Sequence, residues 1–293
     1  MSRINEITII SPTRMMYISR ILKENFENKG IQCHLVPNEG FNIVQYNSFL
    51  LKNPNHYYFI YCLFLLTNIS RLLPRRYIIY QLEQHTNGEI SHHYKKIAPF
   101  LAKIYLNAYM IFDYNEQNIN VIHKTLNMKV KLLPIPFSIQ KNYFSTYDQT
   151  RKDFDIVFIG LINERRRKIL HYLQKHFRVG IPKGNIFGKD LIHFVCRGRL
   201  LLNIHYYNNA ILERPRLNEM IPIGIPIVSE KPNELDLDIM LIYKKNIHFI
   251  DIIEENNIRS SLVSEVRNCF QNRDIESMQK IEDYFIQHFE QYF

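Results

Sequence analysis

Residues 6–36 read EITIISPTRMMYISRILKENFENKGIQCHLV, and this stretch decides the fold. EITIIS (6–11) is β-branched and apolar, which is typical of a buried strand. The apolar residues of the next segment recur at helical spacing: Met16, Ile18, Ile21, Leu22 and Phe26. Gly30 stands where a helix C-cap belongs, and IQCHLV (31–36) predicts a second strand. A strand, a helix and a strand in close succession form a βαβ unit, the start of a parallel sheet.

The same alternation continues along the N-terminal half. The pattern predicts further strands at residues 57–66, 76–83, 109–115 and 129–137, and helices at 90–108 and 115–127. Residues 138–153 are polar and show no apolar periodicity, so they are interpreted as a linker.

The pattern restarts at DFDIVFIG (153–160), a strand that ends on a glycine. An amphipathic helix follows at 163–177, and a later helix begins at Pro215, where a missing N–H does no harm, and ends at Pro222. The remaining predicted elements are strands near 185–188, 200–206, 225–230 and 246–251, a helix at 190–199, and two closing helices.

Two restarting units of this kind predict an α/β protein with two Rossmann-like, doubly wound domains facing a cleft. The first is expected at 1–140 and the second at 153–275, with a C-terminal helix at 276–293 that packs back toward the first domain. In such sheets ligands lie outside the carboxyl ends of the strands, so functional residues are sought in the loops there.

Composition narrows the function classes. The 293 residues are 46% hydrophobic and 22% charged, which is typical of a globular protein of two domains. A net charge of +9 could favour phosphates, nucleic acid or an anionic membrane. The basic residues alternate with acids and no nucleic-acid-binding motif occurs, which argues against nucleic acid.

Cysteine usage and hydropathy predict the compartment. The four cysteines are far apart and lie among apolar neighbours, as expected of buried free thiols in a reducing compartment. No signal peptide is recognised, and the apolar run 57–66 is about half as long as a membrane span. The protein is predicted to be soluble and cytoplasmic, with peripheral membrane contact left open.

The strand at 153–160 ends on Gly160, and the first turn of the helix that follows holds four consecutive cations, Arg165 to Lys168. Cations are unfavourable at a helix N-terminus unless an anion joins them. One interpretation is that one or two of them contact a phosphate. The alternative is a solvated basic helix face.

ERPRLNEMIPIGIPIVSE (213–230) places charges just before a buried strand. Arg216 and Glu219 are three residues apart and share one face of the predicted helix. Glu219 could accept both hydroxyls of a ribose, and Arg216 is placed for a diphosphate. The alternative is an ion pair on the surface. His205 could touch the sugar or diphosphate, or be a hydrogen-bonded core histidine.

Several of these segments carry a resemblance to a known family. Glu219, followed by Gly224 and Pro226, resembles the E-x4-G-x-P segment of GT-B glycosyltransferases related to the "glycosyl transferases group 1" families. DIVFIGLINERRRKIL, IFGKDL and LLLNIHYYNNAILERPRLNEMIPIGIPIVSE occur in the order of its C-terminal nucleotide-sugar domain, so the resemblance covers roughly 153–230. The N-terminal half is similar only in its strand pattern and in YIIYQLEQ and IFDYNEQNI.

The resemblance implies roles for named residues. Glu219 matches the glutamate that holds the nucleotide ribose. The usual second glutamate stands eight positions earlier, where this chain has Ile211; Glu213 is the nearest acid for a sugar contact. Arg166 and Arg216 are the candidates for the diphosphate cations, beside Gly160 and His205 as further nucleotide-sugar contacts.

The resemblance also implies an activity. It indicates a metal-independent glycosyltransferase of hexosyl or deoxyhexosyl type, with a nucleotide-diphosphate sugar as donor, a glycan or lipid-linked acceptor and no further cofactor. An inverting enzyme needs a general base, for which Glu83 and His85 are the candidates, with ordinary loop residues as the alternative. A non-catalytic nucleotide-sugar or glycan-binding protein of the same fold is the alternative function.

Overall fold

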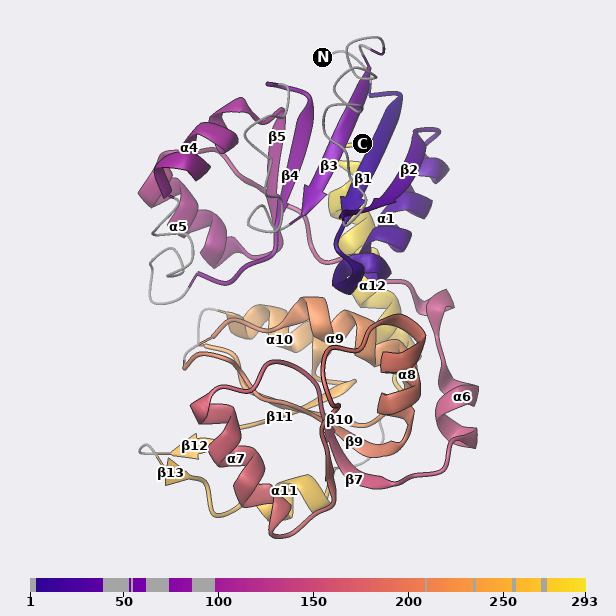
Figure 1. Ribbon diagram of the computed structural model, residues 1–293, viewed down its shortest axis with the longest axis vertical. Helices are drawn as coiled ribbons and strands as arrows, with labels where there is room; N and C mark the ends of the chain where they lie inside the picture. The colour runs from indigo at the N-terminus through magenta and orange to yellow at the C-terminus, as the bar shows by residue number, and fades with distance from the viewer. Residues whose placement is uncertain are drawn as a thin grey trace. The chain divides into compact units, whose positions relative to one another are not determined.

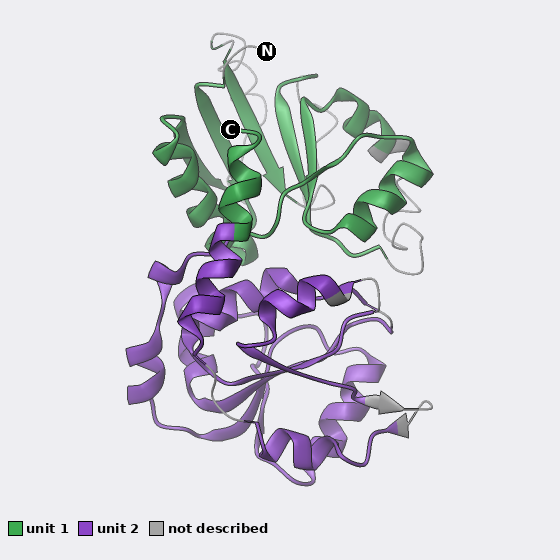
Figure 2. Cartoon of the chain, turned by 180° about the vertical axis from the view of Figure 1, so that it is seen from behind, with its two compact units in different colours: residues 1–136, 284–293 green, residues 137–283 purple. Residues whose placement is uncertain are grey.

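The computed structural model describes residues 4–38, 53, 55–61, 74–85, 98–208, 210–233, 236–254, 257–269 and 273–293 (Figure 1). The chain divides into two compact units, coloured separately in Figure 2. Unit 1 contains Met1–Pro136 and Tyr284–Phe293, and unit 2 contains Phe137–Asp283. The C-terminal residues therefore belong to the same unit as the N-terminus.

Unit 1 is built on a six-stranded sheet with the order β2-β1-β3-β4-β5-β6. Every neighbouring pair in this sheet is parallel. Its strands are β1 Glu6–Ser11, β2 Gln32–Pro37, β3 His56–Tyr61, β4 Tyr77–Gln81, β5 Met110–Asp113 and β6 Lys131–Leu132. Its inner strands β1, β3 and β4 are near-continuous buried runs, as expected of a sheet covered on both faces.

Helices cover both faces of this sheet. On one face α4 (Ala98–Asn107) and α5 (Glu116–Leu126) pack against side chains of β1, β3 and β4. On the other face Phe26 of α1 (Met16–Asn28) packs against Phe59, with ring centroids 5.7 Å apart, and against Phe289 at 5.1 Å. The end of α12 (Ile275–Glu290) therefore completes the core of unit 1.

Unit 2 holds a five-stranded parallel sheet with the order β11-β10-β9-β7-β8. Its strands are β7 Phe154–Phe158, β8 Val179–Gly180, β9 Gly198–Asn203, β10 Ile227–Glu230 and β11 Ile247–Ile250. A short antiparallel pair, β12 (Ile253–Glu254) and β13 (Asn257–Ile258), follows. The prediction of an α/β chain with two parallel sheets is confirmed.

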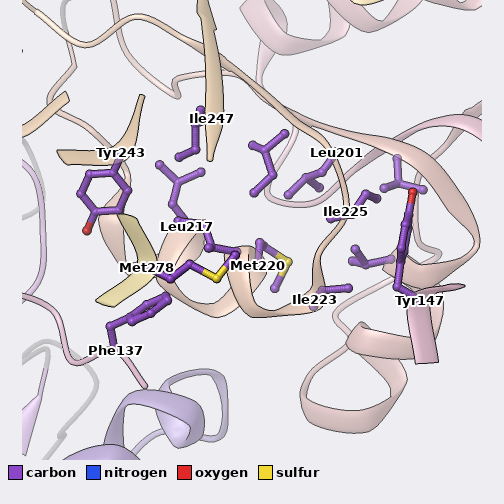
Figure 3. Close-up of a cluster of buried hydrophobic side chains, with 14 of the residues drawn as sticks. Phe137, Tyr147, Leu201, Leu217, Met220, Ile223, Ile225, Tyr243, Ile247 and Met278 are labelled. Atoms are coloured by element: carbon purple, nitrogen blue, oxygen red, sulfur yellow. The ribbon is translucent and has the colours of Figure 1, made fainter. Parts of the chain in front are cut away.

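The helices of unit 2 also lie on both faces of the sheet. One face carries α7 (Glu164–Gln174) and α11 (Leu262–Arg267). The other carries α8 (Gly188–Cys196), α9 (Arg214–Met220) and α10 (Leu237–Tyr243). Figure 3 shows Leu217 and Met220 of α9 inside this second cluster. Burial of these two side chains fixes the rotation of α9 and thereby the direction of its polar residues.

Two predicted strands and one helix that was not predicted differ between the sequence analysis and the structure. The strand expected at 185–188 is wrong: β8 lies earlier, and Gly184 and Gly188 have φ of 88° and 56°, which are incompatible with an extended strand. The strand expected at 129–137 shrinks to two residues because Pro134 and Pro136 lack the N–H that a ladder needs. Helix α10 was not predicted.

The segment expected as a polar linker, 138–153, is structured. It forms η5 (Ile139–Lys141) and α6 (Phe144–Gln149), and Tyr147 is buried in the same apolar cluster as Leu217 and Met220 of α9. Its aromatic residues are too few to show helical periodicity. Of the cysteines, Cys33 and Cys196 are buried free thiols, Cys269 is a partly buried free thiol, and Cys62 lies outside the described residues.

Candidate functional site

The turn at Gly160, after the carboxyl end of β7, is the centre of the candidate site in unit 2. Gly160 has φ of 130°, which strongly favours glycine. A Cβ at this position would lie 2.8 Å from Nη2 of Arg216 and 3.3 Å from Nη1 of Arg166. The sequence predicted these three residues as ligand contacts, and the structure brings them together.

Arg166 is held mainly by the protein itself. Its helix, α7, is capped by Asn163, whose side chain accepts a hydrogen bond from the Arg166 N–H. Nε and Nη2 of Arg166 donate to the Ile204 carbonyl at 2.9 and 2.5 Å, Nη1 donates to Leu161 at 2.9 Å, and Nη2 also donates to Glu213 at 2.8 Å.

The surroundings of Arg166 agree with a structural role. Its side chain is 2% exposed, and its guanidinium lies 5.4 Å from the ring of Phe158 and 5.2 Å from that of Tyr206. Burial lowers the pKa of Arg166 to about 10, so the group stays charged at neutral pH. Arg166 thus joins the loops after β7 and β9, and most of its donors are used within the protein.

Arg216, unlike Arg166, keeps hydrogen-bond donors that the described residues do not use. Its Nη1 donates to Asn203 Oδ1 at 2.9 Å and lies 2.6 Å from Glu213 Oε2. Within the described part of the chain, its Nε and Nη2 have no hydrogen-bond partner, and the side chain is 23% exposed. Arg216 is therefore anchored on one edge of its guanidinium and offers the other edge at the Gly160 turn.

Glu213 uses both carboxylate oxygens to hold this arrangement. Oε1 accepts from Arg166 at 2.8 Å and from the Tyr206 N–H at 3.3 Å, while Oε2 pairs with Arg216. Burial alone would raise the pKa of Glu213, but the guanidiniums of Arg216 and Arg166 outweigh it and hold the pKa below its usual value. The carboxylate is ionised and fully occupied, which leaves it little capacity for the sugar contact predicted from the sequence.

Glu219 lies one helical turn beyond Arg216 on α9. Its carboxylate is half-buried, and among the described residues it has neither a hydrogen bond nor an ion pair. The predicted alternative of an Arg216–Glu219 ion pair is not observed; Arg216 pairs with Glu213 instead. Burial raises the pKa of Glu219 to about 7. A half-buried carboxylate without a partner is free to accept hydroxyl groups of a ligand, so the ribose role stays a prediction.

His205 and Arg165 form a supporting layer at the end of β10. The N–H of His205 donates to Glu230 Oε2, and its Nε2–H donates to the Glu230 carbonyl, both at 2.9 Å. Arg165 pairs with the Glu230 carboxylate and donates to the His205 carbonyl at 2.9 Å. The side chain of His205 is buried, so the geometry agrees with the second predicted alternative, a hydrogen-bonded core histidine.

In unit 1 the two candidate bases lie after the carboxyl end of β4. Asn118 fixes this loop: its side chain accepts from the His85 N–H at 2.9 Å and donates to the Glu83 carbonyl at 2.9 Å and to Asp113 at 3.1 Å. His85 is buried, and burial lowers its pKa to about 4. Glu83 is only half-buried.

Sequence reasoning missed three residues that support the unit 2 site. Asn203 ends β9 and orients Arg216, Asn163 caps α7, and Tyr206 covers the guanidinium of Arg166. The position of Asn203 and Tyr206, in the last half of the strand predicted at 200–206, was an available signal. Which partner each would take depends on contacts between separate loops, which spacing does not show.

No protein-family model matches the sequence. Two uncharacterized proteins of Acanthamoeba polyphaga mimivirus are similar to it, one 30% identical over 199 residues (66% of this chain) and one 26% identical over 137 residues (44% of this chain). The matched residues span 25% and 43% of the length of these relatives, so the chain corresponds to only part of them.

Solved structures with a similar course of the chain share little sequence with it. Spinosyn forosaminyltransferase SpnP has a TM-score of 0.45 and 8% identity, with 99% of this chain and 95% of SpnP covered. A UDP-N-acetylglucosamine 2-epimerase of Listeria monocytogenes, described as putative, has a TM-score of 0.46 and 12% identity, with 99% of this chain and 98% of the epimerase covered. Anabaena HepE in complex with UDP has a TM-score of 0.48 and 13% identity, with 97% of this chain and 95% of HepE covered. Likenesses of this degree assign no activity to the chain.

The described residues lack two further features. No helix among them is both long and apolar enough to cross a membrane. The same residues contain no group of three or more His, Cys, Asp and Glu side chains arranged to hold a metal ion.

Proposed function

We propose that the chain is a glycosyltransferase that moves a hexosyl or deoxyhexosyl group from a nucleotide-diphosphate sugar to a glycan or lipid-linked acceptor, without an essential metal. The observation that carries this proposal is the guanidinium of Arg216, anchored by Asn203 and Glu213 with its free edge at the Gly160 turn. A cation with unused donors at the carboxyl end of a parallel strand suits a phosphate group.

The chemistry of sugar transfer needs such a group. When the bond between the sugar and the diphosphate breaks, negative charge grows on the leaving diphosphate, and a positioned cation stabilises it. The contacts of Arg166 and Glu213 support a fixed geometry for Arg216, since a charge that needs no reorganisation stabilises a transition state best. Glu219, one turn away, is proposed for the ribose hydroxyls.

Glu83 is the stronger of the two candidate bases. A pKa of about 4 leaves His85 neutral at pH 7 but makes it a weak proton acceptor. Its burial also limits access to a substrate hydroxyl. In the proposal His85 and Asn118 shape the loop, and Glu83 accepts the proton of the acceptor hydroxyl.

The burial of His85 also favours a second candidate function. A chain whose loop after β4 serves only to bind would need no accessible base, and a buried, neutral histidine fits that role. In this case the chain is a nucleotide-sugar or glycan-binding protein of the same fold.

Two measurements on the full chain test these functions. A thermal-shift screen with UDP, GDP, CDP and dTDP should raise Tm for one nucleotide, by roughly 5–10 °C at a hundredfold excess over Kd. No shift with any nucleotide would contradict both functions.

Release of nucleoside diphosphate from UDP-glucose, GDP-mannose or dTDP-glucose then separates them. We expect wild type to release it and Glu83→Gln to release it about a hundredfold more slowly with donor affinity unchanged. Binding without release identifies the binding protein, and equal rates in both proteins remove Glu83 as base.

A further inference from the structure

Exposed large apolar side chains gather on the loops that carry the unit 2 site. Among the described residues, five of the eight side chains of this kind lie on the loops that follow β7, β8 and β9: Leu161, Ile162, Phe187, Tyr206 and Tyr207. Apolar groups beside a charged centre usually mark a surface that meets a ligand. Among these side chains, Tyr206 already contacts the site, but its ring is only partly covered by those contacts.

The backbone of Tyr206 is fixed on both sides. Its N–H donates to Glu213 Oε1 at 3.3 Å, and its carbonyl accepts from Asn163 Nδ2 at 2.7 Å. The same Asn163 caps α7 through its Oδ1, which accepts from the Arg166 N–H at 2.9 Å. The ring is thus attached to the groups that hold the guanidiniums, rather than to a loop of independent conformation.

The ring itself is only partly covered. The Arg166 guanidinium lies 5.2 Å from its centroid, and the Tyr207 ring meets it edge to face with centroids 4.9 Å apart. Even so, 36% of Tyr206 remains exposed. A tyrosine ring offers a large, rigid surface at a small cost in side-chain entropy, so a fixed and half-open ring is suited to stacking.

Arg216 separates the contact of Tyr206 from Glu219 along α9. The N–H of Tyr206 donates to Glu213, Glu213 pairs with Arg216 one turn further along, and Glu219 lies one turn beyond Arg216. Along the axis of α9, Glu213 and Glu219 therefore lie on opposite sides of Arg216. A nucleotide sugar has the same order, with a ribose on one side of the diphosphate and the sugar on the other.

We propose that the exposed face of Tyr206 stacks against the ring of the sugar carried by the diphosphate; this rests on the proposed function. The C–H face of a pyranose is apolar and flat enough to lie on an aromatic ring, while its hydroxyls point outward to solvent and polar groups. Tyr206 then distinguishes a nucleotide sugar from the bare nucleoside diphosphate.

The test is calorimetric titration of the full chain with matched pairs: UDP and UDP-glucose, GDP and GDP-mannose, dTDP and dTDP-glucose. For the pair that wild type binds, Tyr206→Ala should weaken the affinity for the nucleotide sugar roughly tenfold and leave the affinity for the nucleoside diphosphate unchanged. Tyr206→Phe keeps the ring and should bind both as wild type does. Leu241→Ala, which removes an exposed apolar side chain from α10, is the control and should change neither affinity.

The outcomes separate this inference from the proposed function. If Tyr206→Ala weakens both members of the pair equally, the ring serves to cover Arg166 or to stack a base, and the inference is overturned. If the variant weakens neither, it is overturned as well. In both cases the proposed function stands as long as wild type binds a nucleotide and Arg216→Met binds it more weakly. If wild type binds no member of any pair, both fail together.

Discussion

Replacement of Arg166 by methionine separates a structural arginine from a ligand-binding one. Methionine keeps most of the side-chain volume and removes the guanidinium. The Ile204 and Leu161 carbonyls lose their donors, and Glu213 keeps only Arg216 and one backbone N–H. Arg216→Met, by contrast, leaves the loops after β7 and β9 joined by Arg166.

The expected loss of stability follows from these contacts. Breaking a buried ion pair by removing one partner costs about 3–5 kcal/mol. Because Glu213 retains Arg216, we take the lower end and expect Arg166→Met to lower the free energy of unfolding of unit 2 by about 3 kcal/mol. At about 2–4 °C per kcal/mol for a unit of this size, Tm falls by roughly 6–12 °C.

Urea unfolding and differential scanning calorimetry of the full chain measure this effect. The matched control is Arg178→Met, which breaks an exposed pair with Asp155 near the start of β7, and its Tm should equal that of wild type. Arg216→Met should lose about 1 kcal/mol, as expected for a partly exposed pair. A Tm of Arg166→Met equal to that of wild type would refute the structural role of Arg166.

Three further predictions concern single groups. Gly160→Ala places a Cβ 2.8 Å from Arg216 Nη2 in a backbone conformation that is unfavourable for alanine. We expect urea unfolding to show a loss of about 1–3 kcal/mol of stability. The nucleotide affinity should also differ from that of wild type, and unchanged binding would contradict this prediction. The pKa of His85 is about 4 in the folded protein and 6.5 as its ordinary value, so the folded protein binds fewer protons and its stability falls as the pH drops from 6.5 to 4. At pH 5 wild type should lose about 2 kcal/mol that His85→Gln does not lose, and equal slopes of stability against pH in the two proteins would count against this assignment. Glu219 has a pKa of about 7, so nucleotide affinity should rise more steeply between pH 6 and 8 in wild type than in Glu219→Gln, where only the terminal phosphate of the nucleotide titrates; parallel pH profiles would remove Glu219 from the ribose.

The fold was predictable from the sequence because the decisive signals are local. The strand, helix and glycine of 6–30 and the restart at 153–160 are each complete within a short stretch, and both parallel sheets follow from them. The errors occur where tertiary contacts decide. Tyr147 gives α6 a place in the core of unit 2, and the conformations of Gly184 and Gly188 exclude the strand expected at 185–188, neither of which periodicity shows.

The candidate site was predictable in its members and less so in its roles. Gly160, Arg166, Arg216 and Glu213 meet because parallel strands bring their carboxyl-end loops to one edge of the sheet. Which arginine is buried depends on whether a backbone carbonyl from another loop reaches it, as that of Ile204 does for Arg166. Spacing along the chain carries no information on that point, so the two arginines were indistinguishable in the sequence.

Calorimetric titration of Arg216→Met with the nucleoside diphosphate that wild type binds tests the central claim most directly. The loss of charge-assisted hydrogen bonds should weaken affinity about 10- to 100-fold, whereas Arg178→Met, with the same change in charge, should bind as wild type does. If Arg216→Met binds the nucleotide with wild-type affinity, the Gly160–Arg216 turn is not the diphosphate site and the account is wrong.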